Sequence, residues 1–158
     1  MVALRLALHP NDLYERLADA LALSLSAAHR AVNRLLQSGL LLPNERRANK
    51  SALQEFLVHG VRYAFPAQLG PETRGVPTAA ALVDFADELP TDGGAVWPSI
   101  EGEVRGPSLT PLHDGAPGAA LRDHRLHRLL ALTDALRLGQ ARERRIAEKL
   151  LAVDLRQA

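Results

Sequence analysis

Apolar residues recur every three or four positions along two neighbouring segments near the N-terminus, residues 13–21 and 25–36. This spacing is that of an amphipathic helix, and it predicts one short helix in each segment. The predicted buried faces are Leu13, Leu17, Ala18 and Leu21 in the first helix and Leu25, Ala28, Val32, Leu35 and Leu36 in the second. The interrupted period between them predicts a tight turn, and Ser24 or Ser26 can cap the second helix by accepting a backbone hydrogen bond.

The opposite face of the second predicted helix carries short, polar and basic side chains. They are Ser26, Ala27, His29, Arg30, Asn33 and Arg34. Helices that enter the major groove of DNA need this chemistry, because Ser, Asn and Arg can bond base edges while other Arg side chains bind phosphates. We expect Arg30 and Asn33 to contact bases, and the small residues Ala18 and Ala28 to let the two helices cross closely.

This pair of helices resembles the winged helix-turn-helix regulators of bacteria and archaea, at the broad level that includes the MarR-like repressors. The resemblance covers roughly residues 2–50, with Ala22 at a turn position where these proteins commonly carry glycine. It implies sequence-specific binding to double-stranded DNA. The function implied is that of a transcriptional repressor acting as a homodimer, because a two-fold symmetric DNA site requires two such helices.

The surrounding pattern completes an N-terminal domain that is predicted over residues 1–65. A short apolar helix is predicted over residues 2–8 and a further helix over residues 51–65. Gly39 predicts the end of the helix before it, because glycine adopts the left-handed backbone conformation without strain.

A short strand is predicted over residues 40–42, followed by a turn or rudimentary β wing over residues 43–50. Arg46, Arg47 and Lys50 in this turn have two interpretations. They either bind DNA phosphates beside the groove, which adds affinity but no sequence information, or form a solvated charged turn.

The composition changes between residues 66 and 118, which hold eight of the ten prolines and eight of the eleven glycines. Proline excludes regular helix over most of this segment. The segment therefore predicts an ordered, irregular region that packs on the helices. Within it, a short helix is predicted near residues 79–88 and a small hairpin across residues 95–106.

Two C-terminal helices are predicted over residues 119–138 and 140–155, separated by Gly139. Their apolar stripes are Leu129, Leu132 and Leu136, then Ile146, Leu150 and Val153. These stripes in residues 119–158 either form a dimer interface or close the core of the monomer. The predicted fold class is mainly α, with a winged-helix-like head of three helices, a minimal β wing, an irregular middle and C-terminal helices.

Hydrophobic residues make up 47% of the 158-residue chain, which is enough for a packed core. The absence of cysteine excludes disulfides and favours a reducing compartment, and no apolar run is long enough for a membrane span. We therefore expect a cytoplasmic, nucleoid-associated protein with no membrane partner. Basic residues outnumber acidic ones by eight to five in residues 1–62 and by nine to five in residues 119–158, whereas residues 63–118 carry two against eight. A basic N-terminal segment is compatible with DNA binding.

We expect no catalytic site, no metal site and no cofactor. His124 and His127 have a spacing that could share a helix face, but a zinc site needs at least a third ligand. The charged stretch over residues 134–145 predicts ion pairs across adjacent turns on a solvated face, such as Asp134 with Arg137. Alternatively, its arginines bind phosphate or the acidic face of a partner.

The leading alternative to a DNA-binding regulator is an antitoxin-like or other protein-interaction module. In that case the irregular middle and the C-terminal helices bind a protein partner, and the N-terminal helices have a secondary DNA role or none. The residues predicted to contact DNA are Ser24, Ser26, Ala27, His29, Arg30, Asn33, Arg34, Arg46, Arg47 and Lys50.

Overall fold

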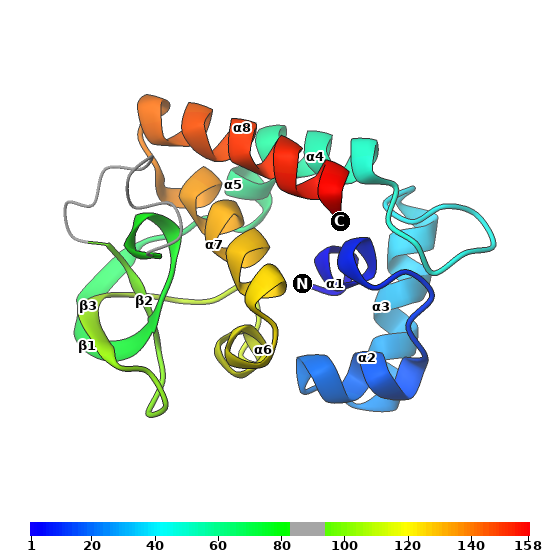
Figure 1. The fold of residues 1–158 in the computed structure, drawn as a ribbon, viewed down its shortest axis with the longest axis horizontal. Coiled ribbons are helices and arrows are strands. Elements are labelled where there is room, and N and C mark those ends of the chain that lie inside the picture. Colours follow the sequence, from blue (N-terminus) through cyan, green and yellow to red (C-terminus); the bar gives the residue numbers. More distant parts are fainter. Residues whose placement is uncertain (83–93) are drawn as a thin grey trace.

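The computed structural model describes residues 1–82 and 94–158 and shows a mainly α-helical chain with one small β sheet (Figure 1). The helices are α1 (Val2–Leu8), α2 (Tyr14–Leu21), α3 (Leu25–Gln37), α4 (Lys50–His59), α5 (Val61–Ala64), the 3₁₀ helix η1 (Ala79–Ala81), α6 (Ala116–Arg122), α7 (His124–Leu138) and α8 (Ala141–Gln157). The strands are β1 (Leu69–Pro77), β2 (Val96–Pro98) and β3 (Val104–Leu109). Helices α2 and α3 lie at one end of the molecule and the sheet lies at the other, with α7 between them (Figure 1).

Helices α2 and α3 are joined by a tight turn in which Ala22 adopts a left-handed conformation with φ 52°. The hydroxyl of Ser24 accepts the backbone N–H of Ala27 at 3.1 Å and caps α3, so the first of the two predicted caps forms. In the middle of both helices the residues predicted to be buried are buried: Leu17, Ala18, Leu21, Ala28 and Val32.

Three residues predicted to be buried in this pair of helices are instead exposed: Leu13 by 54%, Leu25 by 45% and Leu36 by 37%. Leu13 precedes the first turn of α2, which begins at Tyr14. Leu25 and Leu36 lie at the two ends of α3, whereas the buried residues of that helix lie between them.

The chain leaves α3 through Gly39, which has φ 72° and provides the predicted helix end. The strand predicted over residues 40–42 is reduced to one antiparallel bridge between Leu41 and Ala48, which closes a short loop. The helix predicted over residues 51–65 is divided at Gly60 into α4 and α5.

Strand β1 is the central strand of the sheet, because β2 and β3 both pair with it in antiparallel orientation. One parallel pair between β2 and β3 closes the three strands into a small barrel. The hairpin predicted across residues 95–106 is therefore wrong, since the two strands of that region pair chiefly through β1. The register between β1 and β3 shifts between Leu69 and Glu72, which places Pro71 in an irregularity where no ladder N–H is needed.

Of the helix predicted near residues 79–88, only η1 lies in the described part of the chain, and residues 83–93 lie outside it. The helix predicted over residues 119–138 is divided at Asp123 into α6 and α7. The carboxylate of Asp123 accepts the backbone N–H of Leu126 at 3.0 Å and so begins α7 as a new helix.

Helix α7 is the centre of the core, and α1, α5, α6, α8 and η1 all pack against it. Its buried residues are Leu126, His127, Leu129, Leu130, Ala131, Leu132, Thr133, Asp134, Ala135 and Leu136. Helix α8 packs on α7 and α4 and buries Ala147, Leu151 and Leu155. The apolar stripe predicted on α7 is thus buried within the chain, whereas the stripe predicted on α8 is not: Ile146 and Leu150 are half-buried and Val153 is 39% exposed.

A buried polar cluster attaches the sheet to α7. The carboxylate of Asp134 accepts hydrogen bonds from Thr78 Oγ1 at 2.8 Å, from Trp97 Nε1 at 2.7 Å and from Arg137 Nη1 at 2.6 Å. The predicted ion pair with Arg137 is present, but this pair does not lie on a solvated face, because the two side chains are only 1% and 4% exposed. The solvated face holds further along the predicted stretch, where Arg142 and Arg145 are exposed. Burial raises the pKa of the Asp134 carboxyl above its ordinary value, and the three donors act against that rise.

A second polar cluster attaches the N-terminal helices to α7. Asp123 accepts Arg5 Nη1 at 2.8 Å and contacts His9 Nε2 at 2.9 Å, and Arg5 also pairs with Asp12 at 2.9 Å. Burial favours the protonated form of Asp123, but the Leu126 N–H, His9 and Arg5 outweigh it and hold its pKa below the ordinary value.

Candidate nucleic-acid interface

The outer face of α3 is uncovered by any other part of the described chain. Ser26, His29, Arg30, Asn33 and Arg34 are all exposed, as is the capping residue Ser24, whereas Ala27 is half-buried. Ser26, Arg30 and Asn33 follow one another at spacings of four and three, so they project from the same side of the helix. This side presents a hydroxyl, a guanidinium and an amide, which together can donate to and accept from base edges.

Tyr14 holds α2, α3 and the loop after α3 together, a role that the sequence analysis missed. Its ring stacks on His29 with 3.6 Å between ring centroids, and the guanidinium carbon of Arg46 lies 4.9 Å from the centroid of the same ring. The three residues are distant in sequence, so no local spacing could have indicated the contact. His29 and Arg46 therefore fix the position of α3 relative to its neighbours, whatever else they contact.

The three basic residues predicted to contact DNA beside the groove each have a partner within the chain. Arg46 Nε donates to the carbonyl of Asp12 at 3.0 Å, and Arg47 pairs with Glu45 at 2.9 Å. Lys50 Nζ donates to the carbonyl of Ala158 at 2.7 Å, so it points toward the end of α8. The structure therefore does not gather these cations into one free cluster beside α3.

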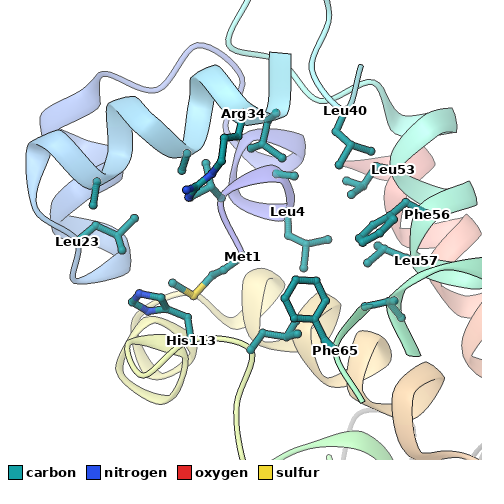
Figure 2. A pocket seen from close by; sticks show the side chains of 17 residues that line it. Met1, Leu4, Leu23, Arg34, Leu40, Leu53, Phe56, Leu57, Phe65 and His113 are labelled. Atoms are coloured by element: carbon teal, nitrogen blue, oxygen red, sulfur yellow. The ribbon is translucent and has the colours of Figure 1, made fainter. Parts of the chain in front are cut away.

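Two of the predicted DNA contacts, Ala27 and Arg34, also line a cavity of about 400 Å³ behind α3. Figure 2 shows Arg34 on one side of it, with Met1 and His113 nearby, and Phe56, Leu57 and Phe65 on the other side. Burial lowers the pKa of the Met1 α-amino group to about 6. The apolar periodicity of the sequence predicts that residues of this kind are buried, but it cannot predict that they surround a cavity.

A second basic surface lies where α4 and α5 meet the start of α8. Arg62, Arg144 and Arg145 line a shallow depression there together with His59 and Tyr63, and the Arg62 guanidinium lies 5.2 Å from the Tyr63 ring centroid. The arginines of α8 are apparent in the sequence, but only the long-range packing of α8 places them beside α5.

His124 and His127 lie on α7, and their ring centroids are 6.5 Å apart. The ring of His127 is buried, and its Nε2 lies 2.7 Å from the carbonyl of Pro77, so it contributes to the attachment of β1. Within residues 1–82 and 94–158 there is no group of three or more His, Cys, Asp or Glu side chains that could hold a metal ion.

Comparisons with protein families, with characterised proteins and with solved structures find no match to this chain. In the part of the chain that the structure describes, no helix has both the length and the apolar character needed to cross a membrane.

Proposed function

We propose that this protein binds double-stranded DNA in a sequence-specific manner, with α3 in the major groove, and acts as a transcriptional repressor. The observation that carries the proposal is the uncovered polar and basic face of α3, held at one end of the molecule by α2 (Figure 1). Had other segments of the chain covered these side chains, they could not reach a duplex.

Arg30 and Asn33 are the side chains that we assign to base edges. Arginine forms two hydrogen bonds with guanine, and asparagine does the same with adenine. Ser26 lies one turn before Arg30, and the exposed start of α3 carries the partial positive charge of the helix dipole, which attracts phosphate. Arg34 contacts the DNA backbone at the edge of this face.

A homodimer is part of the proposal, because two copies of α3 related by a two-fold axis are required for a palindromic site. Since α7 uses its apolar face within the chain, the dimer contact falls to the partly exposed face of α8 or to another surface. Light scattering measures the mass of the protein directly, and a monomer that binds a single half-site would remove this part of the proposal.

The test is a fluorescence-anisotropy titration with a labelled duplex from the region upstream of the protein's own gene, at two salt concentrations. Arg30→Ala is expected to weaken specific binding by about 1–3 kcal/mol and to relax the base preference. Arg105→Ala on β3 is the matched control, because Arg105 is also exposed but belongs to the sheet at the opposite end of the molecule from α3 (Figure 1), and it is expected to leave the specific affinity unchanged. Equal behaviour of both variants would contradict the assignment of α3.

A protein-interaction module is the second candidate, and the surroundings of Tyr63 favour it. Tyr63 is 76% exposed and lies beside Arg62, Arg144 and Arg145, and Tyr and Arg are enriched at protein contact surfaces. Absence of salt-dependent binding to any duplex would support this candidate over the regulator.

A further inference from the structure

The cavity behind α3 has walls from the four helices α1, α3, α4 and α5 and from the segments that connect neighbouring elements. Helix α1 contributes Leu4, α3 contributes Ala31, and α4 contributes Phe56 and Leu57. Its lining is predominantly apolar, and its volume of about 400 Å³ falls within the range of small-molecule sites. Figure 2 shows the side chains of Leu4, Phe56 and Leu57 pointing toward the same space.

Two polar side chains lie at the exposed edge of this cavity. Arg34 is exposed, and its guanidinium forms no ion pair within the described residues. His113 Nδ1 accepts the backbone N–H of Gly115 at 3.0 Å, so the ring hydrogen is on Nε2, which can donate to a ligand. The cavity thus combines an apolar interior with a cation and a hydrogen-bond donor on one side.

We propose that this cavity binds a small molecule with an apolar body and one anionic group. The apolar body packs against Leu4, Phe56 and Leu57, and the anionic group pairs with Arg34. An uncharged molecule of the same shape fills the interior but leaves Arg34 without a partner, so the anion binds more tightly than its uncharged analogue.

The cavity is also positioned to regulate α3, an inference that depends on the proposed DNA-binding function. Ala27, Ala31 and Arg34 lie on the cavity side of α3, one turn apart, directly beside the face that carries Arg30. A bound anion neutralises Arg34 and adds negative charge close to the DNA backbone. Ligand binding therefore lowers the affinity for DNA, and DNA lowers the affinity for the ligand by the same factor.

The direct test uses two fluorescent probes that share one ring system. 8-Anilinonaphthalene-1-sulfonate carries an anionic sulfonate, and N-phenyl-1-naphthylamine lacks it. The sulfonate is expected to bind the native protein about tenfold more tightly than the uncharged probe, because a hydrogen bond between charged groups is worth about that factor. Arg34→Gln should remove this difference without changing binding of the uncharged probe.

Two further variants locate the site. Ala31→Leu places additional side-chain volume in the cavity and should weaken both probes at least tenfold, whereas Arg30→Gln changes an arginine on the same helix outside the cavity and should change neither. Unfolding curves of each variant establish that it is folded before titration. Equal affinity of the two probes for the native protein, or unchanged binding to Ala31→Leu, would overturn the proposed site.

The proposed coupling between ligand and DNA binding is tested separately, by the anisotropy titration with DNA in the presence of saturating sulfonate probe. A lower DNA affinity supports coupling, and an unchanged DNA affinity refutes the coupling while leaving the ligand site in place. Absence of DNA binding without any ligand refutes the proposed function instead, and the probe titrations still decide the cavity because they contain no DNA.

Discussion

Asp134→Ala is expected to lower the free energy of unfolding more than replacement of any other carboxylate described above. Asp134 is the common acceptor for Thr78, Trp97 and Arg137, and so it joins η1, β2 and α7. Its removal leaves the Arg137 guanidinium, which is 4% exposed, without a counter-charge.

The magnitude follows from what remains around Arg137. Its Nε still donates to the carbonyl of Phe65 at 2.9 Å, but a buried charge that loses its partner costs about 3–5 kcal/mol. The Thr78 hydroxyl and the Trp97 indole N–H also lose their acceptor, and each unsatisfied buried donor costs about 1–3 kcal/mol. Contributions within one network do not add fully, so we expect a total near 5 kcal/mol.

Urea unfolding monitored by tryptophan fluorescence measures this loss, because Trp97 is the single tryptophan of the chain and belongs to the cluster. Asp154→Ala is the matched control, since it breaks a 2.7 Å ion pair with Arg128 that is partly open to solvent, and it should cost about 1 kcal/mol or less. Thr78→Val provides a milder change, near 1 kcal/mol, if the alanine variant is largely unfolded. An Asp134→Ala variant as stable as Asp154→Ala would refute the reasoning.

Two further predictions concern DNA affinity and pH. Glu45→Gln should raise the affinity for every duplex alike, because it releases Arg47 from its 2.9 Å ion pair and lets it bind phosphate. Anisotropy titrations at several salt concentrations measure this affinity, and an affinity equal to that of the native protein would place Arg47 away from DNA. Asp123 has a pKa lowered below 3.8, so its ionised form contributes stability that is present above pH 3.8 and is lost as the pH falls through the lowered pKa. Asp123→Asn should therefore lose less stability on acidification than the native protein, as measured by urea unfolding at a series of pH values. An equal loss in both proteins would contradict the stabilising role assigned to the ionised Asp123.

The sequence predicted the α2–α3 pair well because the determinants of this part of the fold are local. Buried spacing at Leu17 and Leu21, the cap at Ser24 and the left-handed Gly39 each act within a few residues. The same locality explains the errors at Leu13, since periodicity fixes a helix face but not the residue at which the helix begins.

The sheet and the break before α7 could not be predicted in this way, because long-range contacts determine them. β1 contains Pro71 and Pro77, which argue against a strand unless the pairing irregularity with β3 is known. Asp123 begins a new helix while it also binds Arg5 and His9, more than a hundred residues earlier in the chain. The cavity behind α3 has the same origin, because its walls come from distant segments.

The position of α3 depends on the C-terminal half of the chain through α1. Helix α1 packs against α3 on one side and against α7 on another, and nearly all of its residues are buried. Arg5 and His9 reinforce this contact through Asp123 at the start of α7. Since α1 also lines the cavity, a ligand there touches the element that joins α3 to the core. A bound molecule would therefore alter the contacts that hold the proposed DNA-binding face in place. Ligand binding can thus change DNA affinity through the position of α3 as well as through the charge of Arg34.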